Sequence, residues 1–322
     1  MQLPPQLCHA IELATSQHNL QSLTQAVIEL SEHYRDQRAV KGMGIATAAH
    51  RLAYAAVRMP ATFTAARAVF REIRRLMPDR RITSLLDLGA GPGTAGWAAI
   101  EVFDGLQQIT LVEQDVEWIR LGKALARSSE KSVLAHAEWV HANLCEVASF
   151  PAHDLVVSSY ALGEIDHKVS RVILQAVWAA ARTAIVIIEP GTMRGFALIR
   201  WLRDDLIALG GHVAAPCPHH DACPMPAHDW CHFSQRVERS SLHRRLKIGT
   251  LGYEDEKFSY IVASKHRITP VNARVIRHPR RHSGHTRMRL CTGDGLQTIT
   301  VTRSDKAQWK CARKIEWGDE WP

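Results

Sequence analysis

The chain has 322 residues, of which 46% are apolar and 22% are charged, a composition that allows a sizeable core. Its 40 Lys and Arg against 32 Asp and Glu give a net charge of +8, which favours a polyanionic partner such as nucleic acid. No apolar run reaches the roughly 18 residues of a membrane-spanning helix, so we expect no membrane association.

The N-terminal stretch, residues 1–20, has neither a basic segment followed by an apolar core nor an Arg-rich, acid-poor transit pattern. We therefore expect a cytoplasmic protein. The chain also has seven cysteines at uneven spacing. Grouped thiols in a reducing compartment are more often metal ligands than disulfides.

Apolar periodicity divides the chain into three stretches. Residues 1–80 carry helical stripes, including Phe63 and Phe70, and are predicted to form an N-terminal helical region. Over residues 81–266, short apolar runs alternate with helical patterns, as in a mostly parallel sheet with crossover helices. Residues 267–322 have the pattern of strands in a small, basic, β-rich extension. The sequence therefore predicts an α/β protein with additions at both ends.

The segment LLDLGAGPGTAGWAA, residues 85–99, has the order strand, glycine turn and helix. Glycines permit a tight turn close to a ligand, and the following helix N-terminus offers free N–H groups. An acid ends this strand, and a second acid ends the next one, where it can accept hydrogen bonds from ribose hydroxyls. The GxGxG pattern resembles the S-adenosylmethionine loop of class I methyltransferases, which implies their Rossmann-like fold. The predicted cofactor-binding residues are Asp87, Gly89, Gly91, Gly93, Glu113 and Asn143.

Catalytic residues are not identified by the same approach. Residues 158–165, SSYALGEI, follow the fourth predicted strand, where amino-directed methyltransferases often carry an N/D-P-P-Y/F tetrad that grips the target nitrogen. This segment has neither that tetrad nor a cysteine. Tyr160 and Glu164 could line a site, although Tyr160 could equally be plain packing. Glu189 could face the cleft or cap the next helix.

Three cysteines lie close together in a proline-containing stretch, within a predicted insertion at residues 212–240. Their spacing is C-x5-C-x7-C, and 59 residues separate the third from a fourth cysteine. Zinc ribbons usually show C-x2–4-C pairs, and the wider spacing favours a group larger than one ion. Thiolates suit soft metals and iron–sulfur clusters, but nearby histidines keep a three-Cys, one-His zinc site as an alternative. The predicted metal ligands are Cys217, Cys223, Cys231 and Cys291.

Several strings together resemble a methyltransferase-like family of small-ribosomal-subunit assembly factors that has mitochondrial and bacterial members. The resemblance runs from about residue 40 to the end of the chain. The strings are YAAVRMPATFTA (54–65), LDLGAGPGTA (86–95), VSSYALGEI (157–165), IIEPGT (187–192), PCPH with DWCHFSQRVERS (216–240), PRRHSGH (279–285) and ARKIEWGDEWP (312–322).

This resemblance implies a ribosome-assembly factor that binds small-subunit rRNA, with a methyltransferase fold and a four-cysteine [4Fe–4S] cluster. Cys217, Cys223 and Cys231 match the family's cluster cysteines in the block, and Cys291 matches the distal one in LCTGDG. The glycine loop matches the family's cofactor loop, which implies S-adenosylmethionine. The three remaining cysteines match no motif.

A basic segment, residues 265–289, contains eight Lys or Arg and no Asp or Glu. Lys and Arg placed on phosphates release counterions, and the arginine fork fits phosphate bidentately and stacks on bases. A solvated pair of strands is the alternative, but the lack of any acid within the segment favours RNA binding. A metal bound at the nearby Cys291 would anchor this segment to the main domain. The predicted RNA-binding residues are Arg274, Arg277, Arg280, Arg281, Arg287 and Arg289.

Three hypotheses follow for the function. The first is a monomeric, rRNA-binding assembly factor that supports translation and uses its cluster to dock the basic extension. The second is an active S-adenosylmethionine-dependent rRNA methyltransferase. The third is a zinc-stapled methyltransferase that acts on a small molecule and shows little salt-dependent RNA binding.

Overall fold

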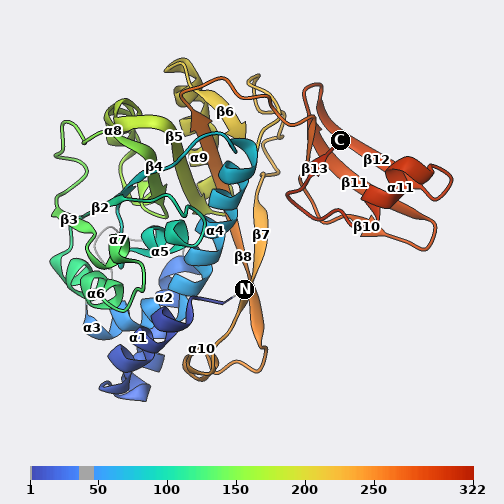
Figure 1. Ribbon diagram of the computed structural model, residues 1–322. Coiled ribbons are helices and arrows are strands. Elements are labelled where there is room, and N and C mark those ends of the chain that lie inside the picture. Colours follow the sequence, from blue (N-terminus) through green and yellow to red (C-terminus); the bar gives the residue numbers. More distant parts are fainter. Residues whose placement is uncertain (1, 36–46) are drawn as a thin grey trace. The chain divides into compact units, whose positions relative to one another are not determined.

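The computed structural model describes residues 2–35 and 47–322 (Figure 1). The chain divides into two compact units. Each unit is assembled from separated stretches of the chain. The first unit comprises residues 1–70, 83–146 and 235–256, and the second comprises residues 71–82, 147–234 and 257–322. The division into stretches 1–80, 81–266 and 267–322 stays a prediction, and residues 1 and 36–46 of its helical region lie outside the described part.

A parallel three-stranded sheet, in the order β3-β2-β1, forms the core of the first unit. Every residue of β1 is buried, as expected of a parallel strand that is covered on both faces. The strands are β1 (Ser84–Leu88), β2 (Gln108–Glu113) and β3 (Glu138–His141), and the connecting helices are α5 (Thr94–Ile100), α6 (Val116–Ala126) and α7 (Ser132–Ala135).

Helices from the start of the chain complete this unit. Phe63 and Phe70 are 1% and 0% exposed, which confirms the predicted apolar stripe on α4. The short helix α10 packs against α2 and α3. None of the described helices is long and apolar enough to cross a membrane. These helices are α1 (Pro5–Ser16), α2 (Leu20–Arg35), α3 (Ala48–Val57), α4 (Met59–Leu76), whose last residues belong to the second unit, and α10 (Ser241–Leu246).

The second unit contains a mixed sheet in the order β4-β5-β8-β6, with β7 also paired to β8. β5 is parallel to β4, whereas β8 is antiparallel to both β5 and β6. Its elements are β4 (His153–Ser159), η1 (Leu162–Glu164), α8 (His167–Ala180), β5 (Ala181–Pro190), α9 (Met193–Ala208), β6 (His212–Ala215), β7 (Phe233–Glu238) and β8 (Tyr253–Ser264), with parts of β7 and β8 in the first unit.

A second, smaller sheet ends the chain. β11 pairs with β10 and β9 along one edge and with β12 along the other, and β13 pairs with β9. Apolar residues of these strands pack with Ala312, Ile315 and Trp321 into a separate core. The elements are β9 (Ala273–Val275), β10 (Arg280–Arg281), β11 (His285–Thr292), β12 (Gly295–Thr302), α11 (Lys306–Ala312) and β13 (Glu320–Trp321).

These elements confirm the predicted fold class: an α/β, Rossmann-like class I methyltransferase fold with an N-terminal helical region and a small β-rich C-terminal extension. One strand is longer than the apolar run that marks it in the sequence. The run FSYIVAS covers residues 258–264, but β8 begins at Tyr253 and includes the charged segment EDEK (254–257).

Candidate functional site

The glycine loop follows β1 in the first unit. Gly89, Gly91 and Gly93 have φ angles of 70°, 53° and 81°, a left-handed conformation that glycine adopts without strain. Gly93 also caps α5, and a Cβ there would lie 3.3 Å from the Trp139 ring. At Gly91 a Cβ would meet nothing within 4 Å. The loop therefore needs glycines for its backbone, and it leaves open space at Gly91.

Glu113, at the end of β2, holds this loop directly. Its Oε2 accepts a hydrogen bond from the Gly91 N–H at 2.8 Å, and its Oε1 accepts one from the Asp115 N–H at 2.9 Å. The structure thus brings the predicted ribose-binding acid to the glycine loop, because the parallel strands β1 and β2 are neighbours in the sheet. Both carboxylate oxygens are engaged by backbone groups of the protein itself.

Asp87, the last-but-one residue of β1, is buried at 1% exposure. Its Oδ2 has no hydrogen-bond partner among the described residues. Burial, together with the nearby charge of Glu113, raises the pKa of Asp87 to about 8. A buried acceptor without a donor is costly, so this oxygen is a natural point for a ligand donor.

Asn143 is engaged locally, in the turn after β3. Its Oδ1 accepts from the Cys145 N–H at 3.0 Å, and its Nδ2 donates to Glu146 at 2.9 Å. This is an Asx-type turn. The predicted contact between Asn143 and a cofactor stays a prediction.

Sequence reasoning missed Asp115 and Arg51, which support the same region. Asp115 caps α6, with its Oδ1 accepting from the Glu117 N–H at 2.8 Å, and its Oδ2 pairs with Arg51 of α3. The signal in the sequence was an Asp placed just before the apolar helix. Because Glu113 accepts from the Asp115 N–H, this cap and the glycine loop are connected by hydrogen bonds.

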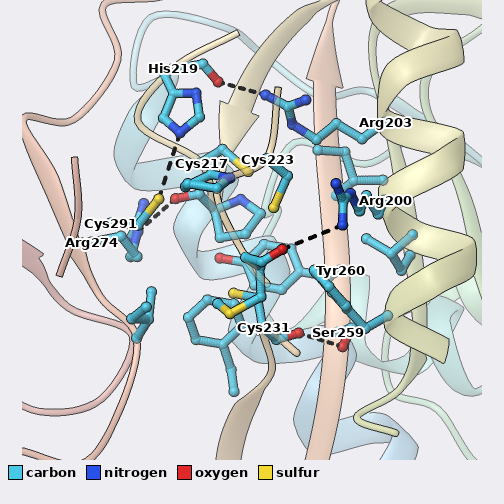
Figure 2. Close-up of a pocket in the computed structure, with 18 of the residues that line it drawn as sticks. Arg200, Arg203, Cys217, His219, Cys223, Cys231, Ser259, Tyr260, Arg274 and Cys291 are labelled. Atoms are coloured by element: carbon cyan, nitrogen blue, oxygen red, sulfur yellow. Dashed lines mark hydrogen bonds between the residues drawn. The ribbon is translucent and has the colours of Figure 1, made fainter. Parts of the chain in front are cut away.

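The second site is a cavity of about 40 Å³ in the second unit, lined by all four predicted metal-binding cysteines (Figure 2). Cys217 and Cys223 lie in the loop after β6, Cys231 lies just before β7, and Cys291 lies in β11. The four cysteines, which come from distant positions in the C-terminal part of the chain, therefore lie together. The wall also includes Phe196, Met225 and Ile276, which pack together as an apolar cluster.

The thiols influence one another electrostatically. Burial raises the pKa of Cys231 well above its usual range, and the charges of Cys217, Cys223 and Cys291 raise it further. Burial and the first two of these cysteines raise the pKa of Cys291 to about 12. Among residues 2–35 and 47–322, no group of three or more His, Cys, Asp or Glu is arranged to hold a single metal ion.

Two buried arginines hold the loop that carries these cysteines. Arg203 of α9 donates to the carbonyl oxygens of His219 at 3.0 Å and Asp221 at 2.7 Å. Arg274 of β9 donates to the carbonyl oxygen of Pro216 at 3.0 Å. Both cations oppose the rise in the pKa of the Cys217 thiol, so both favour thiolate in the cavity. His219 also lines the cavity, and its Nε2 lies 3.6 Å from the Cys291 sulfur.

The six predicted RNA-binding arginines have different environments. Arg274 is only 2% exposed and pairs with Glu72, so the structure places it in the interior, where its guanidinium does not face a nucleic acid. Four of the six arginines form ion pairs with acids that lie outside the basic segment. The sequence of the segment alone does not reveal these pairs. Arg280 and Arg287 are exposed, and the described residues supply no ion-pair partner for either one. The compensating pairs are Arg274–Glu72, Arg277–Asp229, Arg289–Asp229 and Arg281–Glu316.

The fold and the two sites define a methyltransferase-type α/β protein. Its four-cysteine cavity is lined by residues of both the C-terminal sheet and the main sheet of the second unit. A family model described as mitochondrial small ribosomal subunit Rsm22 matches residues 48–322. The chain belongs to this family.

Curated relatives agree with that membership. The human ribosome assembly protein METTL17, mitochondrial, is 28% identical over 293 residues, which cover 84% of this chain and 62% of the human protein. Rsm22-cox11 tandem protein 2, mitochondrial, of Schizosaccharomyces pombe is 24% identical over 322 residues, covering 84% of this chain and 43% of that protein. The chain thus spans less than two thirds of the length of these relatives.

Solved methyltransferases are more distant. Magnesium protoporphyrin IX methyltransferase of Synechocystis PCC 6803 matches with a TM-score of 0.41 and 11% identity, over 75% of this chain and all of that one. The pyocyanin biosynthetic protein PhzM matches with a TM-score of 0.40 and 16% identity, over 74% of this chain and 61% of that one. The fold assignment rests on the strands and connections of this chain rather than on these matches.

The prediction of a cytoplasmic location is wrong. The matching family is described as mitochondrial, and the human and yeast relatives are named as mitochondrial proteins. The prediction rested on the lack of a transit pattern in residues 1–20, and the lack of a pattern in one stretch does not determine a compartment.

Proposed function

We propose that this protein is an assembly factor for a small ribosomal subunit of mitochondrial type, that it binds rRNA, and that a [4Fe–4S] cluster on its four grouped cysteines supports this binding. Membership of the family supports the ribosomal role. The observation that carries the proposal is the convergence of Cys217, Cys223 and Cys231 with Cys291 of the basic sheet on one cavity.

The donor set fits an iron–sulfur cluster. All four thiols line one cavity, and four cysteines are the usual ligand set of such clusters. Their spacing in the sequence, C-x5-C-x7-C, also differs from the C-x2–4-C pairs of zinc ribbons. When bound, the cluster would cross-link the loop after β6 to β11.

The electrostatics of the cavity also suit such a group. Buried thiols with raised pKa values hold their protons in the absence of a cation, and metal binding displaces those protons. Arg203 and Arg274 add two buried positive charges near the ligands, which would offset the negative charge of a thiolate-bound cluster. Their hydrogen bonds also fix the backbone from which the cysteines project.

The glycine loop supports S-adenosylmethionine as the cofactor of the first unit. Asp87 offers an unpartnered buried oxygen, and Gly91 leaves open space for a ligand. We assign Asp87, Gly89, Gly91, Gly93, Glu113 and Asn143 to this site. Glu113 would accept a ligand hydroxyl in addition to its two backbone N–H groups, because a carboxylate offers about four acceptor positions.

One observation favours the second candidate function, an active rRNA methyltransferase. Tyr160, in the loop after β4, has a φ of 59°, a left-handed conformation that is strained for a residue with a side chain. The buried Glu189 holds this loop by accepting from the Gly163 N–H at 3.0 Å. Strain of this kind is concentrated at functional sites, and this loop lies where methyltransferases of this class hold their targets.

Replacing Cys223 by Ser tests the cluster and its connection to RNA together. The variant should lose bound iron and should bind small-subunit rRNA more weakly at a fixed salt concentration, because the cross-link to β11 is lost. Cys145→Ser is the matched control, since Cys145 is exposed and lies outside the cavity. Loss of iron with unchanged rRNA affinity would show that the cluster does not support binding.

Methyl transfer is tested separately, with labelled S-adenosylmethionine and immature small subunits. Incorporation that Asp87→Ala abolishes would identify an rRNA methyltransferase. Cofactor binding without incorporation supports an assembly factor alone. A protein that contains zinc, lacks visible absorbance and shows no salt-dependent RNA binding would instead fit a methyltransferase for small molecules.

A further inference from the structure

The C-terminal sheet has two chemically different faces. Along β11, Thr286, Met288 and Leu290 are buried, and the last two belong to the apolar core that packs with Ala312 of α11. Side chains alternate between the faces of a strand, so Arg287, Arg289 and Cys291 project from the opposite face. Figure 1 shows α11 lying along this sheet, near β11 and β12.

Strand register extends this second face across three strands. Arg280 of β10 lies directly opposite Arg287 of β11, which in turn lies opposite Thr300 of β12. The next row pairs Arg289 with Thr298. Successive rows are about 6.8 Å apart along the strands. The result is two adjacent rows that combine guanidinium groups with hydroxyl groups.

The charge on these rows is one-sided. β10, β11 and β12 contain no Asp or Glu, and Thr298 and Thr300 are exposed beside the arginines. Arg280 and Arg287 are exposed as well, without an ion-pair partner among the described residues. Arg289 lies 3.5 Å from Asp229, which partly compensates its charge.

The same face leads to the cysteine cavity. Cys291 lies two residues beyond Arg289, and its cross-strand neighbours are Arg274 and Leu296. All three of these residues line the cavity. The arginine rows therefore have a fixed register relative to the metal-binding strand, set by β11 itself.

We propose that the rows Arg280–Arg287–Thr300 and Arg289–Thr298 form a phosphate-binding surface for the backbone of structured RNA. Guanidinium and threonine hydroxyl groups are common donors to phosphate oxygens. The two rows themselves carry no aromatic side chain, although the stacked rings of His282 and His285 lie at the next position along this face. Contacts to phosphate carry no sequence information, so these two rows would hold the RNA backbone rather than read its bases. This inference rests on the proposed rRNA-binding function and assigns it to particular residues.

The test compares the full chain with the double variant Arg280→Gln, Arg287→Gln. In vitro transcribed small-subunit rRNA is the probe, and affinity is measured at a series of KCl concentrations. Each phosphate contact contributes about one unit to the slope of log affinity against log salt, so the double variant should have a slope shallower by about two. The far-UV circular dichroism should be unchanged, because both residues are exposed.

The matched control is Arg313→Gln with Lys314→Gln, the same loss of two charges at exposed residues immediately after α11. Its slope should stay close to that of the unmodified protein. If the slope becomes shallower by the same amount in the control as in the Arg280, Arg287 variant, the attraction is diffuse and the assignment is overturned. If the Arg280, Arg287 variant keeps the slope of the unmodified protein, the proposed phosphate-binding surface is wrong, although the protein still binds rRNA. If the unmodified protein does not bind rRNA, the proposed function fails, and the surface fails with it.

Discussion

Replacing Arg274 by Met tests how the C-terminal sheet is held to the rest of the second unit. The buried guanidinium donates to the carbonyl oxygens of Pro216 at 3.0 Å and Gly318 at 2.8 Å. Its Nη2 lies 2.7 Å from Glu72, a residue of the last turns of α4. One side chain therefore connects the cysteine loop, the C-terminal segment and α4.

The expected cost follows from these contacts. Removing one partner of a buried ion pair costs about 3–5 kcal/mol. Glu72 keeps a second partner in Arg75, at 2.9 Å, which lowers the cost of leaving its carboxylate behind. We therefore expect Arg274→Met to reduce the free energy of unfolding by about 3 kcal/mol.

The assay is urea unfolding of the full chain, followed by circular dichroism. Arg313→Met is the matched control and should change stability by less than about 0.5 kcal/mol, because Arg313 is exposed. The double variant Glu72→Gln, Arg274→Met should lose less than the sum of the two single variants, since no unpaired carboxylate is left. A loss below about 1 kcal/mol for Arg274→Met would refute the reasoning, because it is far below the cost of breaking a buried pair.

Three further predictions follow. Asp87→Asn should flatten the pH dependence of stability. Because the pKa of Asp87 is raised to about 8, the folded protein retains a proton that the unfolded chain loses above about pH 4. The stability of the unmodified protein therefore falls as pH rises to about 8. Urea midpoints at about pH 5 and about pH 8 check this, and an unchanged difference contradicts it. Gly122→Ala should cost about 1–3 kcal/mol, because its Cβ would lie 2.1 Å from the Trp139 ring, whereas Gly252→Ala, in open space, should cost much less. Arg51→Met should weaken S-adenosylmethionine binding, because it removes the partner of Asp115, whose N–H donates to Glu113. Calorimetry measures the affinity, and an unchanged affinity would show that Arg51 does not support the cofactor site.

Local patterns in the sequence were enough for the fold class and for the proximity of the glycine loop to its acid. Alternating strand and helix periods identify the α/β layers. The glycines mark the turn whose left-handed φ angles the structure confirms. Matching motifs also grouped Cys291 with the three nearby cysteines, and the cavity confirms that the four lie together.

Long-range pairing could not be predicted in the same way. The basic segment has no acid of its own, but Glu72, Asp229 and Glu316 approach it from distant parts of the chain. Arg274 has the apolar neighbours Ala273 and Val275, and alternation along β9 turns its side chain into the cysteine cavity. A count of charges along the sequence contains no information about either effect.

The iron and acid-labile sulfide content of the protein, purified without oxygen, tests the central claim most directly. The proposed cluster predicts about four iron and four sulfide per chain, together with broad visible absorbance, and Cys291→Ser should lose them. One zinc per chain, with no sulfide and no visible absorbance, would contradict the account.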